Sequence, residues 1–200
     1  MKNILFVCTG NTCRSPMAEA LVKHKTNKIK ARSAGIFAGH GQPASRGTTE
    51  ALREKGILLR HQSQPVTQDL INWADLILTM TTNHKQSLVM QFPQVDDKVY
   101  TLKEYVDAEH QRVWTDLKKA YATLEEKRAN LQSQSEAAGR LEMEKQIKED
   151  LRKIDELESK LNHVDIHDPF GGDVEIYRKT LKELEKHIEL LIEKLDNKDR

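Results

Sequence analysis

An almost entirely apolar run near the N-terminus leads directly into a loop that contains a cysteine and an arginine. Residues 3–8 read NILFVC, and TGNTCRS follows before helical spacing begins at Pro16. A continuous apolar run of this length is typical of a strand buried on both faces of a parallel sheet. Proline fits the first turn of a helix because its missing N–H has no partner there. The chain therefore opens with a strand–loop–helix unit.

The following segments alternate between the same two kinds of element. Apolar runs bounded by turn residues predict further strands over 29–33, 74–80 and 97–102. Helical spacing and capping residues predict helices over 47–55, 68–72, 82–92 and 174–196. Strands that alternate with helices indicate an α/β fold with three layers and an open, parallel, four-stranded sheet.

The composition changes after residue 107. Residues 108–162 contain almost no glycine or proline and are rich in Glu, Lys, Gln, Ala and Leu. Apolar residues recur at helical spacing in two stripes: Val113, Leu117, Ala120, Leu124 and Leu131, then Ile147, Leu151, Ile154 and Leu161, with Leu157 close by. The segment 133–139 can turn between them. This pattern predicts an inserted antiparallel coiled-coil hairpin at 108–162, within a discontinuous domain of 1–107 and 163–200.

Charge and cysteine content limit the classes of function. The formal net charge is +1, so the chain is not expected to bind nucleic acid or an anionic membrane surface. It contains no apolar run of membrane-spanning length. Its two cysteines, Cys8 and Cys13, are too few for a secreted disulfide framework, which favours a reducing cytoplasm.

The loop after the first strand has the composition of a phosphate site. Gly10 tolerates backbone angles that other residues resist, so the loop can turn its N–H groups inward. The helix that begins near Ser15 adds the positive end of its dipole, and Arg14 offers a planar fork for two oxygens. The same positive field favours the thiolate form of Cys8. A thiolate below a bound phosphoryl group is a nucleophile, and the Ser15 hydroxyl can donate a hydrogen bond to it.

These residues resemble a known family. CTGNTCRS followed by PMAEA is similar to the signature of the low-molecular-weight protein phosphatases. The resemblance continues, in the same order, through RSAG (32–35), ADLILTM (74–80), DKVYTLKEY (97–105) and DPFGG (168–172). It implies a flavodoxin-like fold and hydrolysis through a phosphocysteine intermediate.

The resemblance also implies roles for particular residues. Cys8 is the nucleophile, Arg14 the phosphate clamp, and Asp168 the acid that protonates the leaving group. Phosphate binding falls to Thr9, Gly10, Asn11, Thr12, Cys13, Arg14 and Ser15, with Phe170 at the mouth of the site. The mechanism requires no metal or other cofactor, and the expected partners are phosphorylated proteins.

Two features point to one branch of the family. Tyrosine-directed members usually carry Ile or Leu at the position of Thr12, and an aromatic pair after Asp-Pro. Thr12 and the run Phe170-Gly171-Gly172 instead resemble the protein-arginine phosphatases. A β-branched threonine narrows the pocket against a phenyl ring and accepts a slimmer guanidinium. A tyrosine phosphatase is the alternative, because selectivity depends on few side chains.

Several residues have a structural interpretation beside the functional one. Cys8 could be an ordinary buried cysteine, and Thr12 a neutral substitution. Cys13 either packs against the sheet or traps oxidised Cys8 in a reversible disulfide. Asp168 could cap the last helix. His84 is expected on the surface of its helix.

The inserted hairpin leaves three hypotheses open. It could bind a protein partner or a second copy of the chain, shape access to the active site, or serve as a tolerated spacer. It also allows a different class of function, in which the chain is an adaptor that grips phosphate without hydrolysis. Arsenate reduction would need further cysteines to relay a disulfide, and none follows Cys13.

Overall fold

The computed structural model describes residues 2–133, 137–161 and 164–198. The chain divides into two compact units, Met1–Val106 with Val164–Arg200, and Asp107–His163. That these units are domains able to fold independently stays a prediction.

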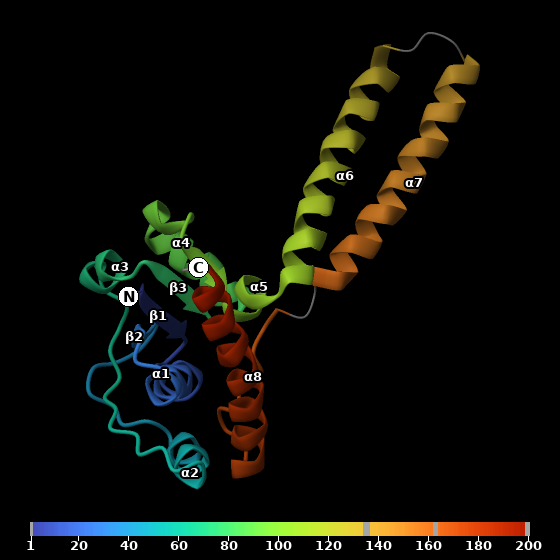
Figure 1. Ribbon diagram of the computed structural model, residues 1–200. Coiled ribbons are helices and arrows are strands. Elements are labelled where there is room, and N and C mark those ends of the chain that lie inside the picture. The colour runs from blue at the N-terminus through green and yellow to red at the C-terminus, as the bar shows by residue number, and fades with distance from the viewer. Residues whose placement is uncertain (1, 134–136, 162–163, 199–200) are drawn as a thin grey trace. The chain divides into compact units, whose positions relative to one another are not determined.

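A parallel sheet forms the centre of the first unit (Figure 1). Its strands are β1 (Lys2–Cys8), β2 (Ile29–Gly35), β3 (Leu76–Thr79) and β4 (Val99–Thr101), in the order β2-β1-β3-β4. Each neighbouring pair is parallel. The predicted open, four-stranded α/β sheet is confirmed, and the carboxyl ends of its strands lie at one edge.

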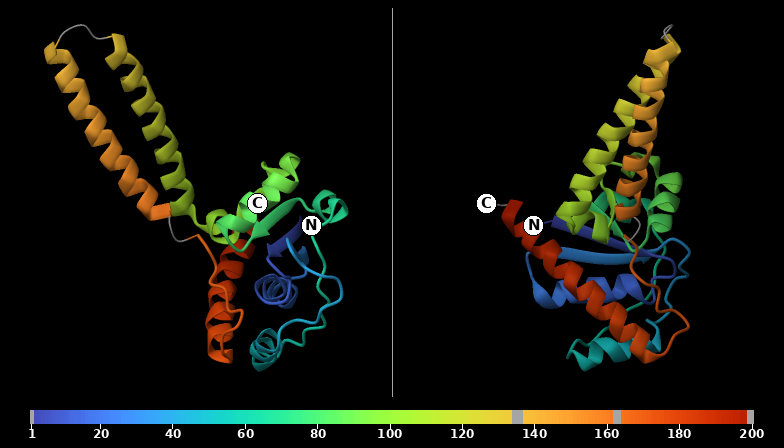
Figure 2. Two further views of the ribbon diagram at one scale, coloured as in Figure 1. Left: turned by 180° about the vertical axis from the view of Figure 1, so that it is seen from behind. Right: turned by 90° about the vertical axis from the view of Figure 1, so that its right-hand side faces the viewer.

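Helices cover both faces of this sheet (Figure 2). Ile4 and Phe6 of β1 pack in one buried cluster, and the alternating Leu5 and Val7 pack in another. The first cluster includes residues of α1 (Arg14–Lys25), α2 (Arg46–Glu54), α5 (Leu102–Val106) and α8 (Val174–Lys198). The second includes residues of α3 (Gln68–Trp73), α4 (Thr82–Gln91) and the 3₁₀ helix η1 (Pro93–Val95). Burial on both faces explains why β1 is apolar throughout.

Two local features depart from the expected bounds. Helix α1 begins at Arg14 rather than at Pro16, so the arginine belongs to its first turn. The five-residue helix α5 was not expected and takes Leu102 from the predicted strand 97–102. Thr101 and Glu104 explain it: Glu104 N–H donates to Thr101 Oγ1 (3.1 Å), and Thr101 N–H donates to Glu104 Oε2 (3.1 Å). This reciprocal pair is a capping box, which starts a helix.

The second unit is a helical hairpin of α6 (Ala108–Ser133) and α7 (Ala137–Leu161), which run antiparallel. Leu117, Leu124 and Ile154 are buried between the two helices. Lys127 also joins them, because its Nζ lies 2.6 Å from Asp150 Oδ2. Of the turn expected at 133–139, Ser133 and residues 137–139 belong to the two helices, and residues 134–136 lie outside the described part of the chain.

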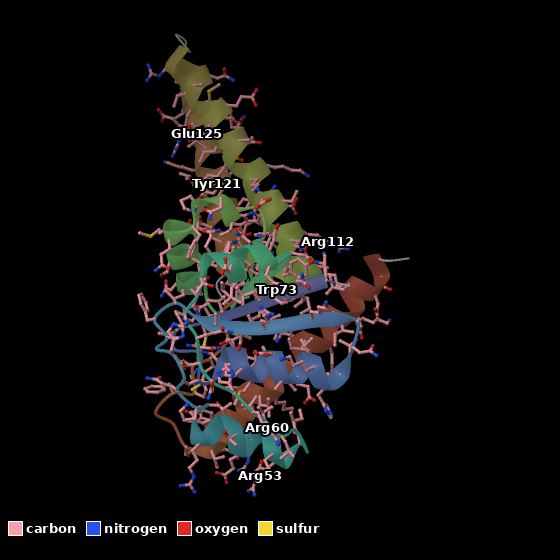
Figure 3. All side chains as sticks on the ribbon, turned by 90° about the vertical axis from the view of Figure 1, so that its left-hand side faces the viewer. Arg53, Arg60, Trp73, Arg112, Tyr121 and Glu125 are labelled. Atoms are coloured by element: carbon pink, nitrogen blue, oxygen red, sulfur yellow. The ribbon has the colours of Figure 1, made fainter. Side chains whose placement is uncertain are left out.

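The expected stripe on α7 is wrong at one position. Leu151 is 38% exposed, whereas Leu157 packs against the buried seam. Tyr121 adds a polar contact between the helices, with its hydroxyl 2.5 Å from Glu158 Oε1 (Figure 3). The hairpin is therefore closed by a narrow apolar seam with polar contacts beside it, as in a two-stranded coiled coil.

Gly35 offers a test of how the sheet supports the loop after β1. A Cβ atom at Gly35 would lie 2.5 Å from Thr9 O and 2.8 Å from Asn11 N. We expect Gly35→Ala to displace this loop and to lower the free energy of unfolding by about 1–3 kcal/mol. Gly39→Ala is the control, since its nearest neighbour is the mobile end of Gln42 at 3.4 Å. Equal urea-unfolding midpoints for both variants would contradict the expectation.

Candidate active site

The loop after β1 turns its carbonyl groups toward the surrounding protein. Thr9 O accepts a hydrogen bond from Phe37 N–H (2.9 Å), and Thr12 O accepts one from Ser45 N–H (2.9 Å). Within the described chain, the N–H groups of residues 9–13 donate to no protein acceptor. A run of free amides between bonded carbonyls is the backbone arrangement that binds the oxygens of an anion.

Asn11 holds the loop in this shape. Its φ of 54° is left-handed, which asparagine tolerates better than most residues. Its buried side chain donates from Nδ2 to Ser15 Oγ (2.9 Å) and Ser33 Oγ (2.9 Å), and its Oδ1 accepts from Gln64 N–H (3.0 Å). The Asn11 carbonyl oxygen also lies 2.6 Å from His61 Nε2. The side chain is fully engaged with protein, so only the backbone of Asn11 remains for a ligand.

Cys8 lies at the end of β1 with its sulfur close to Ser15. The Sγ–Oγ distance is 3.0 Å, and both side chains are buried. Ser15 Oγ accepts a hydrogen bond from Asn11, and its own hydrogen has two acceptors within reach, the Cys8 sulfur at 3.0 Å and Ala34 O at 3.4 Å. The sulfur therefore lies at the floor of the loop, within hydrogen-bond distance of the Ser15 hydroxyl.

Arg14 and Asp168 form an ion pair. Arg14 is 4% exposed, and its Nη2 lies 2.6 Å from Asp168 Oδ2, while its Nη1 donates to Ile166 O (3.3 Å). Arg14 Nε is buried and has no hydrogen-bond partner among the described residues. The guanidinium is thus fixed on one side and keeps a free N–H for a further acceptor.

The segment before Asp168 is anchored to the strand edge. Ile166 N–H donates to Met80 O (2.8 Å), and Asp165 Oδ1 accepts from Thr82 N–H at the start of α4 (2.7 Å). The carbonyl of Asp165 accepts from Lys103 Nζ (2.8 Å). All of these partners belong to the first unit, so the contacts named here hold the segment before Asp168 within that unit.

The alternative in which Asp168 caps α8 is wrong. Asp173 does this instead, since its Oδ1 accepts from Ile176 N–H (3.1 Å). Asp168 Oδ1 accepts from Phe170 N–H (3.1 Å), which folds the loop back on itself. The ring of Phe170 is 77% exposed, and so is Phe37 at 74%, whose backbone is bonded to Thr9. Sequence reasoning missed Phe37, although it follows β2 directly at the same sheet edge.

Cys13 is buried with its sulfur near three hydroxyl groups. Its Sγ lies 3.3 Å from Ser45 Oγ, 3.7 Å from Thr12 Oγ1 and 3.7 Å from the Tyr177 hydroxyl. Burial raises the pKa of Tyr177. Both cysteines are free thiols, and a redox role for Cys13 stays a prediction.

His84 belongs to the site, and its expected surface position is wrong. It is 9% exposed at the start of α4, with its Nε2 2.8 Å from Thr9 Oγ1. Burial lowers the pKa of His84 to about 4, and the positive charge of Arg14 acts in the same direction. The imidazole is therefore neutral near pH 7 and supports the loop by hydrogen bonding. The signal for it was its place just after β3, where the strand ends converge.

The described residues form neither a metal-binding cluster nor a membrane-spanning helix. No group of three or more His, Cys, Asp or Glu side chains among them converges on a metal position. No helix in the part of the chain described here combines the length and the apolar character needed to cross a bilayer.

The sequence matches the model of one protein family. Residues 3–153 match the family described as low molecular weight phosphotyrosine protein phosphatase. The chain therefore belongs to this family, whose members are cysteine-dependent phosphatases.

Individual relatives match over nearly the whole chain. A protein-arginine-phosphatase of Bacillus subtilis (strain 168) is 37% identical, with 99% of both chains covered. The solved structure of the YwlE arginine phosphatase from Geobacillus stearothermophilus has a TM-score of 0.69 at 34% identity, covering 99% of this chain and 95% of the other. A second YwlE structure, of a mutant with a phosphorylated active-site serine, also has a TM-score of 0.69, at 36% identity, and covers 97% and 95%.

The buried position of His84 predicts a pH effect on stability. Because its pKa is lowered to about 4 from an ordinary value near 6.5, the unfolded chain binds the proton more readily than the folded chain. The free energy of unfolding should then fall as the pH decreases from about 6.5 to about 4, with no contribution from His84 above that window. His84→Gln removes this titration, so its stability should fall less steeply in urea unfolding at a series of pH values. A difference between the two proteins that is constant across the window would refute the assignment.

Proposed function

We propose that this chain is a protein-arginine phosphatase that hydrolyses phosphoarginine through a phosphocysteine at Cys8. The observation that carries the proposal is the loop of free amides, residues 9–13, between the Cys8 sulfur and the buried guanidinium of Arg14. Full-length similarity to proteins named arginine phosphatases supports the choice of substrate.

The chemistry proceeds in two displacements. The Cys8 thiolate attacks phosphorus, the P–N bond breaks, and the protonated Asp168 carboxyl gives its proton to the departing guanidine nitrogen. The resulting Asp168 carboxylate then takes a proton from a water molecule, whose oxygen attacks the phosphocysteine. Phosphate leaves, the Cys8 thiolate returns, and Asp168 is protonated again. The loop amides and Arg14 stabilise the charge on the equatorial oxygens in both steps.

The ion pair between Arg14 and Asp168 links substrate binding to acid catalysis. A phosphoryl dianion that accepts hydrogen bonds from Arg14 competes for the Nη2 donor that Asp168 now holds at 2.6 Å. Transfer of that donor to the phosphoryl oxygen frees the carboxyl group. Asp168 is half exposed, so it can take up a proton and turn toward the leaving group.

Thr12 is the proposed selectivity residue. It is partly buried, and its Oγ1 lies 3.7 Å from Cys13 Sγ within the loop. Its branched, polar side chain narrows the approach to the loop, which disfavours a phenyl ring. A tyrosine phosphatase remains the second candidate, and the name of the family supports it.

The proposed reaction also implies the partners of the protein and the compartment in which it works. Phosphorylated proteins are its partners, and we place it in a reducing compartment such as the cytoplasm, because Cys8 must stay a thiol to react.

We further propose that the hairpin contacts a protein partner or a second copy of the chain. Three large apolar side chains lie exposed outside its seam: Trp114 (46%), Leu141 (58%) and Leu151 (38%). The adaptor hypothesis, in which this contact is the whole function, predicts no turnover of any phosphate ester or amide.

Side-by-side hydrolysis of phosphoarginine and phosphotyrosine peptides tests the substrate. The wild type should prefer phosphoarginine. Thr12→Ile should shift the ratio of the two kcat/KM values toward phosphotyrosine by about ten-fold or more, because it exchanges a polar group for apolar contact with the ring. Thr12→Ser is the matched control and should keep the preference. Cys8→Ser should bind phosphate without turnover. An unchanged ratio in Thr12→Ile would remove the role given to Thr12.

Replacement of residues 108–162 by a short Gly/Ser link tests the independence of the two units. Lys103 Nζ donates to Asp165 O (2.8 Å), so described residues on the two sides of the replaced segment are hydrogen-bonded to each other. We expect kcat/KM for free phosphoarginine to stay within about two-fold of the wild type, since additivity holds for groups that share no partners. Light scattering would show whether self-association is lost. A large fall in kcat/KM, with an intact thermal transition, would instead assign the hairpin to the active site.

A further inference from the structure

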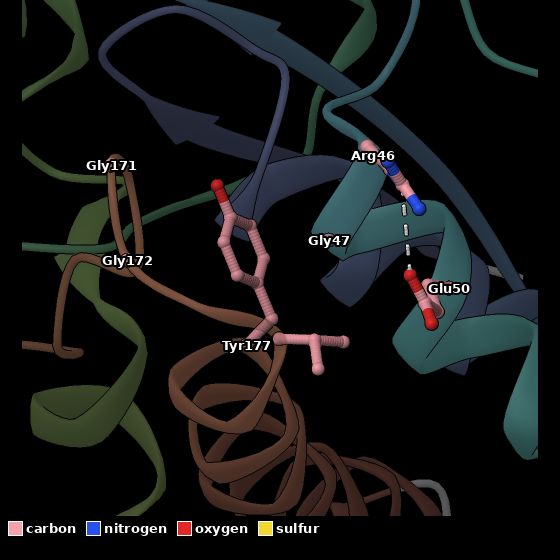
Figure 4. Close-up of a pocket in the computed structure, with 7 residues that line it drawn as sticks. Arg46, Gly47, Glu50, Gly171, Gly172 and Tyr177 are labelled. Atoms are coloured by element: carbon pink, nitrogen blue, oxygen red, sulfur yellow. Dashed lines mark ion pairs between the residues drawn. The ribbon is translucent and has the colours of Figure 1, made fainter.

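A groove of about 500 Å³ lies beside the catalytic loop, between α2 and the loop that follows Asp168. Arg46, Gly47 and Glu50 form one wall, and Gly171, Gly172 and Tyr177 are on the other (Figure 4). None of the roles assigned above to the reaction uses this groove.

The walls of the groove are closely packed, so its shape is preformed. A Cβ atom at Gly47 would lie 2.5 Å from the ring of Tyr177. One at Gly172 would lie 2.7 Å from Ile176 Cδ1 and 3.1 Å from Pro169 O. A side chain at Gly47 would meet the ring of Tyr177, and one at Gly172 would meet Ile176 and Pro169 O, so glycine at these positions keeps both walls of the groove open.

Two contacts connect the walls of the groove to the phosphate loop on the side of Thr12. Ser45, next to Arg46, donates its N–H to Thr12 O (2.9 Å), and the Tyr177 hydroxyl lies 3.7 Å from Cys13 Sγ. Gly171 follows the loop residues Asp168 and Phe170. A peptide that places a phosphoarginine side chain in the loop therefore brings its neighbouring residues over the groove.

Arg46 gives this groove a positive charge, which a peptide residue next to the phosphoarginine would contact. Its side chain is 96% exposed, and its Nε lies 3.9 Å from Glu50 Oε2, at the limit of an ion pair. Glu50 is the more covered partner, with 34% of its side chain exposed. The attraction between two exposed charges at this distance is weak. The Arg46 guanidinium can therefore form a second, bidentate pair with a carboxylate that approaches in its plane.

We propose that this groove is a substrate subsite that binds an acidic side chain adjacent to the phosphoarginine. The inference rests on the proposed function, since it deepens the choice of substrate at the same site. Arg46 pairs with the carboxylate, and the closely packed wall at Gly47 and Tyr177 contacts the methylene groups of the same side chain.

Three peptides and two variants test the subsite. The peptides carry phosphoarginine flanked on both sides by aspartate, by glycine or by lysine, and the readout is the ratio of kcat/KM between the aspartate and lysine peptides. The wild type should favour aspartate by about three- to five-fold, as for an exposed ion pair, and Arg46→Glu should abolish or reverse the preference. Arg53→Glu is the control, because it makes the same charge change on the same helix (Figure 3) without lining the groove.

The outcomes separate the two levels of the proposal. Hydrolysis of free phosphoarginine with equal kcat/KM for all three peptides would overturn the subsite and leave the function standing. An equal loss of preference in Arg53→Glu and Arg46→Glu would also overturn it, because the effect would be the overall charge of the helix. No hydrolysis of any phosphoarginine compound by the wild type would instead refute the function itself.

Discussion

The left-handed backbone of Asn11 decides which way the phosphate loop faces. With φ at 54°, the chain turns so that its carbonyls reach Phe37, Ser45 and His61 while its amides remain unpaired. This conformation is costly for a residue other than glycine, and the buried hydrogen bonds from Asn11 to Ser15 and Ser33 offset the cost. Ser15 Oγ, which accepts one of these bonds, lies 3.0 Å from the Cys8 sulfur. Loop shape and nucleophile are therefore held by one polar network.

The insertion enters the chain between two segments that are already tied to the sheet. Before it, the capping box of Thr101 and Glu104 fixes α5 directly after β4. After it, Ile166 bonds to Met80 and Asp165 bonds to Thr82. A long insertion between anchored ends adds little strain to the surrounding fold, because antiparallel helices return the chain near its starting point. This explains how the family's catalytic loop tolerates so large an addition beside it.

Much of the fold and of the candidate site was predictable because the signals are local. The apolar β1 and the spacing from Cys8 to Arg14 lie within one short stretch, so the sequence alone predicts a phosphate-binding loop there. The features that the sequence did not predict depend mainly on tertiary contacts. His84 follows β3 closely, which places it near the converging strand ends, but its burial depends on the contact of its Nε2 with Thr9 Oγ1. The helix α5 is a different case, since its TLKE capping box is a local signal that overlaps the apolar end of the predicted strand 97–102.

Details of the hairpin and of the groove also depend on tertiary contacts that the sequence pattern does not show. Helical spacing predicted its seam at Leu117, Leu124 and Ile154, but it could not choose between Leu151 and Leu157, which lie near the edge of the stripe. The groove at Arg46 and Tyr177 joins residues from α2 and α8 that are distant in sequence, and no periodicity connects them. Surface cavities of this kind depend on the relative placement of whole elements, which pattern reasoning does not supply.

The contact between Arg14 and Asp168 also affects which anions bind to the phosphate loop. A singly charged ion such as chloride offers one point of attraction and would have to break a short, charge-assisted hydrogen bond to reach the guanidinium. A tetrahedral dianion reaches the arginine and several backbone amides at once, so it gains more than the carboxylate loses. The ion pair therefore favours tetrahedral dianions, inorganic phosphate among them, over monovalent ions such as chloride.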